Sequence, residues 1–340
     1  MVSADRAESN LLMALTRLGL SGASVAAAGN GGNSRVFLLS LAGGERLAAK
    51  VYPAPTAEGR SRLDVEFSAL GFLEARGETA VPRPVARDDE AQVGIYEYVL
   101  GEPVHQPGEA HLDEMLAFLE RLRGYSRLEG AACLPPASAS VLRETGEAWE
   151  DCPDACPGWG PLSRGTALRF QALLEVEAER SDHGDMLRFV RAELVPALKA
   201  FAQGEPVAGP WTLSPSDLGF HNALVRTDGS VCFLDFEYFG RDDPAKMLCD
   251  VLLHPGNRMR PAQRTDFVKR TVRLYAQGDP GLAGRLAALY PVAALAWCAI
   301  MLNPFLPGHH ADPGIAAVRL DAARNMLALA RQGISEGDFE

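Results

Sequence analysis

The spacing of hydrophobic and polar positions changes near residue 100. Before that point, short apolar runs alternate with glycine-containing bends: residues 24–53 hold three such runs, with one bend at AGNGG and another at Gly43 and Gly44. Residues 83–89 and 92–100 add two more runs. Apolar runs of this length between turn residues predict strands, and tight bends predict antiparallel pairing. We therefore expect a small antiparallel sheet of five strands.

Two helices are expected beside these strands. Residues 5–20 carry leucines at helical spacing. Residues 59–75 repeat apolar side chains every three or four positions, which suits a helix packed on the sheet; these are Leu63, Phe67, Leu70 and Leu73. The first hundred residues thus combine one sheet with an inserted helix.

After Gly101 the pattern becomes helical. Helices are predicted at 108–123, 138–150, 165–181, 184–203, 243–253, 261–277, 290–303 and 314–332. The segment between 126 and 164 is rich in Pro, Ala, Ser and Gly, and its ends are expected to be loops. The predicted fold class is α+β: a small β-rich lobe at 1–100 and a larger, mainly helical lobe at 101–340.

Composition limits the function classes. The chain has 340 residues, 47% hydrophobic and 23% charged, and a net charge of -11. Such acidity argues against non-specific nucleic-acid binding, which needs a basic surface. It can steer a cationic small molecule, but an ordinary acidic soluble protein is the better explanation of the charge. Six cysteines are too dilute for a disulfide scaffold, and Cys152 and Cys156 lack the nearby histidines of a zinc site.

Nothing in the sequence favours a membrane protein. The N-terminus has acidic residues where a secretory signal is basic. The longest apolar stretch, residues 286–302, is interrupted by Pro291 and falls short of the ~20 residues that span a bilayer. We expect a buried helix there and a cytoplasmic protein.

Two segments of the second half carry candidate chemistry, LSPSDLGFHNAL at 213–224 and CFLDFEYFG at 232–240. Phosphoryl transfer needs a carboxylate to accept the acceptor's proton and oxygen ligands to hold magnesium on the phosphates. Asp217 is the candidate base, and Asn222 and Asp235 are the candidate metal ligands. Glu237 is an extra ligand or an orienting partner.

The first glycine bend can fold over a triphosphate, because glycine lets backbone N–H groups approach phosphate oxygens closely. The candidates are Gly31, Gly32, Asn33 and Ser34. The segment matches neither the P-loop nor the dinucleotide fingerprint. Taken alone, it is better explained as an ordinary hairpin turn.

Lys50 ends the third apolar run and is flanked by apolar residues, so it needs a partner inside the small lobe. Glu66, on the following helix, is the expected partner. A structural ion pair is the alternative explanation, but a buried pair is costly to maintain. In the crossing segment YEYVLGEPV, the carbonyl of Glu97 and the N–H of Val99 are expected to contact an adenine ring.

The chain resembles the aminoglycoside phosphotransferase and choline kinase-like family of small-molecule kinases, distant relatives of protein kinases. The resemblance rests on GGNSRVF, the lysine and glutamate pair, the Asp-x4-Asn loop and LDFEYFGRDDP. It implies a two-lobed protein-kinase-like fold that binds ATP and Mg2+, with Asp217 as catalytic base. It also implies that Asn222 and Asp235 are metal ligands.

The chain departs from this family at two places. Pro215 and Ser216 replace the family's usual His-Gly before the catalytic Asp, and His221 is not an equivalent histidine. Met247 stands at the second acidic position of the D-P-x-x-D pattern, where Asp250 is expected to serve instead. Neither change removes a group that the chemistry requires.

The expected acceptor is a small hydroxylated molecule such as a sugar, an aminocyclitol or an amino alcohol, contacted by candidates that include His183, His254 and His309. An inactive nucleotide-binding pseudokinase is the alternative, and aminoglycoside resistance is less favoured. A protein kinase is disfavoured because Asp242 follows Asp235 too closely for an activation segment. An aromatic content of 7% gives no sign of a nucleic-acid stacking groove. No oligomeric state is predicted.

Overall fold

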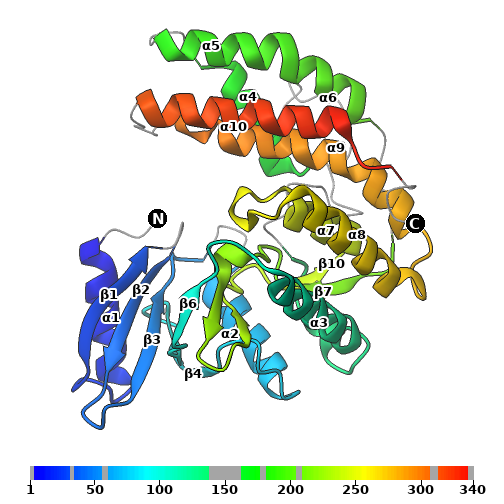
Figure 1. Ribbon diagram of the computed structural model, residues 1–340. Coiled ribbons are helices and arrows are strands. Elements are labelled where there is room, and N and C mark those ends of the chain that lie inside the picture. The colour runs from blue at the N-terminus through cyan, green and yellow to red at the C-terminus, as the bar shows by residue number, and fades with distance from the viewer. Residues whose placement is uncertain are drawn as a thin grey trace. The chain divides into compact units, whose positions relative to one another are not determined.

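The computed structural model describes residues 4–30, 34–55, 60–137, 162–176, 181–203, 209–306 and 313–335 (Figure 1). The chain forms two compact units. The first comprises Met1–Ser138 and Leu213–Arg241, and the second comprises Ala139–Thr212 and Asp242–Glu340. The predicted division into a β-rich lobe at 1–100 and a mainly helical lobe at 101–340 stays a prediction.

The first unit is built on a five-stranded antiparallel sheet. Its strands follow the order β1 (Ser24–Asn30), β2 (Arg35–Ser40), β3 (Arg46–Val51), β5 (Val93–Glu97) and β4 (Pro84–Asp88). Each neighbouring pair is antiparallel. The five-stranded sheet predicted from the apolar runs is confirmed.

One face of this sheet is a dry core covered by α1 (Ala4–Arg17), the dark-blue helix of Figure 1. Side chains alternate between the two faces of a strand, so every second residue of β3 and β5 points to this side. The cluster includes Leu11 and Leu15 of α1 with Phe37, Leu39, Leu47, Ala49, Val51, Val93 and Ile95. The leading helix expected at 5–20 therefore covers the face opposite to Lys50.

The other face carries the polar residues that matter for chemistry. Lys50 and Tyr52 alternate with the core residues of β3, and Lys50 pairs in register with Gly94 of β5. A Cβ at Gly94 would clash with the Tyr96 ring, so glycine makes room for that ring. Helix α2 (Arg62–Glu74) begins at the Ser61 cap and supplies Glu66.

A second, smaller sheet joins segments that are far apart in the sequence. Its strands are β6 (Gly101–Pro103), β8 (Ala223–Arg226) and β9 (Val231–Phe233), in that order. A Cβ at Gly101 would meet the backbone of Val225, so the close pairing requires glycine there. Helix α3 (Glu109–Tyr125) packs against this sheet, where the rings of Phe118 and Phe233 stack with centroids 4.9 Å apart.

Short elements complete the path of the chain around this sheet. They are the helical turns Ala131–Cys133 and Phe220–Asn222, and the paired strands β7 (Thr212–Ser214) and β10 (Gly240–Asp242). Strands β7 and β8 flank Asp217 in the sequence.

The described residues of the second unit are mainly helical. Its long helices are α4 (Arg164–Leu174), α5 (Ser181–Phe189), α6 (Val195–Phe201), α7 (Pro244–Leu253), α8 (Pro261–Ala276), α9 (Leu282–Met301) and α10 (Pro313–Gln332). A π-helical stretch, Val190–Leu194, joins α5 to α6. Pro196 explains it, because its ring would clash with the carbonyl four residues earlier in a regular α-helix.

Three helix predictions need correction. The helix expected at 165–181 ends at Leu174, and the next helix begins at Ser181. The helix expected at 290–303 begins at Leu282 and contains Pro291. The cost of the lost hydrogen bond and of the ring clash is offset by packing against α7 and α10. The helix expected at 184–203 is interrupted by the π-helical stretch. The helix predicted at 138–150 lies outside the described residues.

Helix α9 is long and apolar enough to cross a membrane by length and composition, contrary to the expectation that the segment is too short. However, 61% of its most apolar window is buried inside the protein. Helices α7 and α10 pack on it, and α10 lies alongside it in Figure 1. It is the core helix of the second unit, as the sequence predicts.

A closed ionic cluster lies near the start of α7 in the second unit. Asp243 caps α7 by accepting the N–H of Ala245 at 2.7 Å. The Arg285 guanidinium donates to both carboxylate oxygens of Asp243, at 3.0 and 3.1 Å. It also donates to both oxygens of Asp279, at 2.8 and 2.6 Å. Every carboxylate oxygen of this cluster accepts a hydrogen bond.

Candidate active site

Asp217 lies on a tight loop directly after β7. The residue before it, Ser216, has a left-handed backbone with a φ of 67°, which is uncommon outside glycine. Its N–H donates to the side-chain oxygen of Ser214 at 3.0 Å, which holds this conformation. Ser214 and Ser216 thus shape the loop at the place where the resembled family has His-Gly.

The Asp217 carboxylate has two neighbours that follow it in sequence. The Nε2 of His221 lies 3.2 Å from Asp217 Oδ1. The side-chain amide of Asn222 donates to the main-chain oxygen of Asp217 at 3.2 Å and to its Oδ2 at 3.4 Å. The contact with His221 is absent from the sequence interpretation, because it depends on the short helical turn at Phe220–Asn222, which leaves no periodic signal in the sequence.

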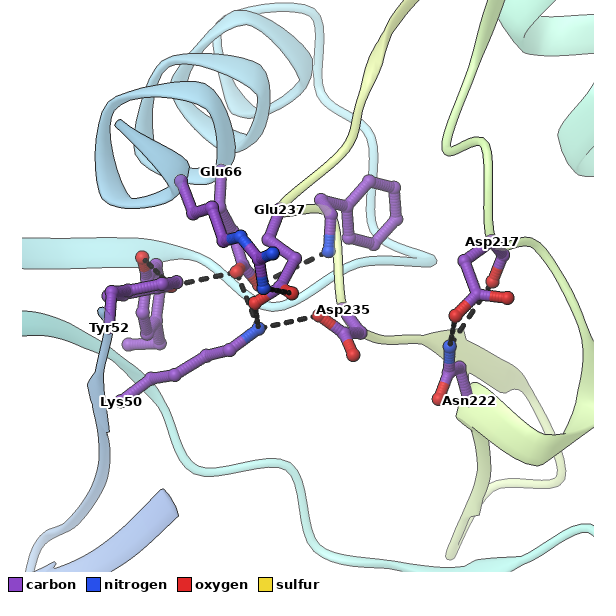
Figure 2. Close-up of polar contacts among 10 residues, drawn as sticks. Lys50, Tyr52, Glu66, Asp217, Asn222, Asp235 and Glu237 are labelled. Carbon is purple, nitrogen blue, oxygen red and sulfur yellow. Dashed lines mark hydrogen bonds and ion pairs between the residues drawn. The ribbon is translucent and has the colours of Figure 1, made fainter. Parts of the chain in front are cut away.

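Asn222 and Asp235 lie on adjacent segments because β8 and β9 pair. Ala223 is opposite Phe233 in the register, and the N–H of Leu234 donates to the main-chain oxygen of Asn222 at 2.8 Å. Asp235 follows with a φ of 66°, a conformation that turns the chain sharply at the strand end. Figure 2 shows the Asn222 side-chain amide turned to Asp217 on one side, with Asp235 on the neighbouring segment.

Lys50 is surrounded by three carboxylates (Figure 2). Its Nζ lies 2.7 Å from Glu66 Oε2, 2.6 Å from Asp235 Oδ1 and 3.3 Å from Glu237 Oε2. The predicted pair of Lys50 and Glu66 is therefore present, and the same amine also contacts the candidate metal ligand. The structure brings β3, α2 and the segment after β9 together at this atom.

Glu66 is held in place from several directions. It is only 4% exposed, and its Oε2 accepts the Tyr52 hydroxyl at 2.7 Å. Its Oε1 accepts the main-chain N–H of Phe236 at 3.2 Å. The Tyr96 hydroxyl contacts Tyr52 at 2.7 Å and extends this chain of hydrogen bonds. These contacts link α2 to the residues next to Asp235.

Glu237 joins the cluster through a residue that the sequence interpretation does not name. The Arg62 guanidinium, at the first position of α2, donates to Glu237 Oε1 at 2.9 Å. The same guanidinium lies over the Tyr238 ring, 4.9 Å from its centroid. The other oxygen, Glu237 Oε2, is buried and accepts no hydrogen bond from the described residues.

The charges around Lys50 determine its protonation. Burial alone would lower the pKa of the ammonium, but the carboxylates of Glu66, Asp235 and Glu237 outweigh it, so the pKa lies well above its usual value. Burial raises the pKa of the Glu66 carboxyl, and Lys50 opposes that shift. Three carboxylates face the two cations Lys50 and Arg62, so this cluster keeps an excess of negative charge.

The donor set suits a magnesium ion, which prefers oxygen ligands. Within the described part of the chain, the side-chain oxygen of Asn222 and Oδ2 of Asp235 accept no hydrogen bond. The Asp235 side chain is 31% exposed, so it remains accessible to solvent. Glu66, Asp235 and Glu237 also place oxygens within 4.8 Å of one another, but the Lys50 ammonium already contacts all three.

The nucleotide-binding candidates are only partly described. Gly31, Gly32 and Asn33 lie outside the described residues, and Ser34 is buried at the start of β2. The main-chain N–H of Glu97 donates a hydrogen bond to the carbonyl oxygen of Arg83 at 2.9 Å. Among the described residues, none accepts a hydrogen bond from the Val99 N–H. Their contact with a nucleotide stays a prediction.

The acceptor candidates belong to the second unit or to undescribed residues. His254 packs edge-on against Trp297, with centroids 4.9 Å apart, and its Nδ1 accepts the Gly256 N–H at 3.0 Å. His183 packs against Phe305 at 6.0 Å. His309 lies outside the described residues. Their contact with an acceptor stays a prediction.

A small antiparallel sheet with a lysine and glutamate pair, followed by an Asp-x4-Asn loop and an Asp just after a strand, defines a kinase-type phosphotransferase. The sequence matches the phosphotransferase enzyme family over residues 24–285, and the chain belongs to that family. No curated protein matches the sequence.

Solved structures share the fold at low sequence identity. The choline kinase LicA from Streptococcus pneumoniae has a TM-score of 0.59 and 16% identity, covering 94% of this chain and 98% of that chain. The gentamicin complex of APH(2")-IIa has a TM-score of 0.57 and 14% identity, covering 100% and 99%. The amicoumacin kinase hAmiN, with AMP-PNP and Ca2+, has a TM-score of 0.54 and 12% identity, covering 98% of both chains.

Family membership confirms the predicted α+β two-lobed kinase fold and the predicted enzyme class, an ATP-dependent small-molecule kinase. It also implies the use of a nucleotide and a divalent metal.

Proposed function

We propose that this protein transfers the γ-phosphoryl group of ATP, with Mg2+, to a hydroxyl of a small metabolite such as a sugar, an aminocyclitol or an amino alcohol. One observation carries the proposal: the required groups gather within one compact unit. Lys50 contacts Glu66 and Asp235, while Asn222 contacts Asp217 and adjoins the residue before Asp235.

In this proposal Asp217 accepts the proton of the acceptor hydroxyl as the new P–O bond forms. A general base must lie within hydrogen-bond reach of the proton that it removes. The Asp217 carboxylate is one-third exposed, so a hydroxyl can approach it. His221 and Asn222 contact its two oxygens and fix its orientation.

Lys50 binds the α- and β-phosphate oxygens through its ammonium. Its raised pKa keeps it charged at neutral pH. Glu66 is buried and bonded to Tyr52 and to the Phe236 N–H, so it holds the ammonium at a fixed position. Glu237 provides a second carboxylate for Lys50 when phosphate or metal engages Asp235.

Asn222 and Asp235 would hold the magnesium ion through their side-chain oxygens. The bound ion supplies positive charge that neutralises the phosphate oxygens. The chain's own contribution is to fix these ligands: the pairing of β8 with β9 sets their spacing, and the left-handed backbone at Asp235 directs its side chain out of the strand.

A small alcohol is favoured as acceptor because the solved structures of similar fold include a choline kinase and a gentamicin complex of APH(2")-IIa. The net charge of -11 supports a cationic or neutral acceptor over an anionic one. A cytoplasmic location, where ATP is available, is part of this proposal.

The pseudokinase alternative rests on Pro215 and Ser216, which replace the resembled family's His-Gly. In the structure the loop is instead supported by the Ser214 side chain, and His221 contacts Asp217. These two contacts support the loop in place of the family's histidine, so we favour the hypothesis of an active enzyme.

The test is ADP release from ATP with Mg2+ across a panel of sugars, aminocyclitols, amino alcohols and nucleosides. We expect at least one acceptor to raise ADP release in the wild-type protein and Asp217→Asn to abolish that increase. Nucleotide-dependent thermal stabilisation without any acceptor-dependent ADP release would favour the pseudokinase.

A further inference from the structure

A cavity of about 310 Å³ lies within the second unit, among α7, α8, α9 and the end of α10. Its walls combine apolar and polar side chains; they include Leu252, Val268, Leu329, Ile334, Arg264, Thr265, Tyr290 and Gln332. None of the proposed phosphotransfer residues lines it. Small-molecule pockets measure about 300–1,000 Å³, so this volume suits a small ligand.

Arg264 lines this cavity without a carboxylate partner among the described residues. One terminal nitrogen of its guanidinium donates to the Tyr290 hydroxyl at 2.6 Å. Arg270, on the same helix, instead pairs with Asp266 at 3.4 Å. A guanidinium has five N–H donors and no acceptor, so Arg264 keeps donors available for a ligand.

Tyr290 adds a second donor at the same place. It is only 2% exposed, and its hydroxyl oxygen accepts the bond from Arg264. Its own proton therefore needs a different acceptor, and the described residues supply none. Burial raises the pKa of Tyr290, so the hydroxyl keeps that proton at neutral pH. Buried polar groups nearly always have partners, which points to an acceptor that enters the cavity.

We propose that this cavity binds a small monocarboxylate with an aliphatic body. One carboxylate oxygen accepts a charge-assisted hydrogen bond from the Arg264 guanidinium, and the other accepts the Tyr290 hydroxyl proton. The aliphatic body packs against Leu252, Val268 and Leu329. A cation is disfavoured, because the polar end of the cavity offers donors and positive charge.

The site is independent of the proposed phosphotransfer, because its lining residues belong to the second unit and Asp217, Asp235 and Lys50 belong to the first. Binding is therefore tested without nucleotide. Failure of this proposal leaves the kinase proposal untouched, and the reverse also holds.

The test is calorimetric titration of the full-length protein with hexanoate, with hexylamine and acetate as comparison ligands. Hexanoate should bind saturably with one site, and hexylamine should not bind, because it reverses the charge. Acetate should bind at least about tenfold more weakly, because it buries fewer methylene groups. Equal binding of hexanoate and hexylamine, or no binding of hexanoate, would overturn the proposal.

Variants locate the site. Arg264→Gln should weaken hexanoate binding about tenfold or more, and Tyr290→Phe roughly threefold to tenfold, as expected for hydrogen bonds to a charged group. Arg264→Lys should retain part of the affinity. The matched control Arg273→Gln removes the same charge from an exposed position of α8 and should change nothing.

One outcome of these variants would contradict the proposal. It is equal weakening of hexanoate binding by Arg264→Gln and Arg273→Gln, which would indicate a general charge effect.

Discussion

The two ionic clusters of the molecule differ in how completely their charges are satisfied. In the second unit, Arg285 donates to all four carboxylate oxygens of Asp243 and Asp279. In the first unit, Lys50 faces three carboxylates, and Glu237 Oε2 is buried without a hydrogen bond from the described residues. The Arg285 cluster is closed, whereas in the Lys50 cluster Glu237 Oε2 has only the ion-pair contact with Lys50 at 3.3 Å and Asp235 is 31% exposed to solvent. A closed cluster serves stability, and an open one is suited to bind a cation.

The largest effect is expected at Asp217, which adjoins the open cluster. Asp217→Ala should lower kcat/KM about 10²–10⁴-fold, the range for loss of a general base. The thermal midpoint should change little, because the side chain is partly exposed. Acceptor-dependent ADP release measures kcat/KM, and thermal unfolding measures the midpoint. A loss below threefold would remove Asp217 from the proposed mechanism.

The same substitution in each cluster gives the sharpest contrast. Asp235→Asn should lower kcat about 10²–10³-fold, because a metal ion supplies several kcal/mol of transition-state stabilisation. It should leave stability unchanged or slightly raised, because it removes one of three mutually repelling carboxylates. Kinetics and urea unfolding of the purified variant test this. A loss of stability without a loss of activity would reverse the assignment of this cluster.

Asp279→Asn is the matched variant in the closed cluster. It should destabilise the protein by about 3–5 kcal/mol, because it leaves the buried Arg285 without one of its charged partners. Activity per folded molecule should stay at the wild-type level at a temperature where the variant is folded. Urea unfolding and kinetics are the readouts. Unchanged stability would show that this cluster is not structural.

The link between α2 and Glu237 is expected to have an intermediate effect. Arg62→Gln and Glu237→Gln should each lower kcat about tenfold, through loss of the charged contact that aligns α2. The double variant should be no worse than the more severe single variant, giving a coupling of about 0.5–3 kcal/mol. Strictly additive losses in this double-mutant cycle would show that the two residues act separately.

The smallest effect is the alkaline pH dependence of Lys50. Its pKa is raised in the folded protein, so its contribution to stability is fully present below the unfolded pKa of about 10.4 and declines above it. The difference in unfolding free energy between wild type and Lys50→Met should be equal at pH 7 and 9. At pH 11 it should be about 1 kcal/mol smaller. A difference that changes between pH 7 and 9 would contradict the raised pKa.

Much of the fold follows from local pattern. The five strands of the sheet and α2 are predicted from apolar spacing, and so is the partnership of Lys50 with Glu66, because apolar flanks leave the lysine few alternatives. The internal position of Pro291 in α9 is not predictable locally, since packing against α7 and α10 offsets the lost hydrogen bond.

The missed parts of the site depend on distant contacts. Arg62 and Glu237 are 175 residues apart in the sequence, and no local rule pairs them. The contact between His221 and Asp217 spans four residues, but it depends on the helical turn at Phe220–Asn222, which is too short for a periodic signal. Which carboxylate oxygens of Asp235 and Glu237 lack a hydrogen bond can be determined only from the positions of neighbouring residues in the structure.

The central claim is that the open cluster in the first unit performs phosphoryl transfer. The most direct measurement follows the γ-phosphoryl group of labelled ATP in the presence of an acceptor found in the panel, with wild type and Asp217→Asn compared. We predict label on the acceptor hydroxyl in proportion to the ADP formed, and none with Asp217→Asn. Label found only in inorganic phosphate, or equal transfer by both proteins, would contradict the account.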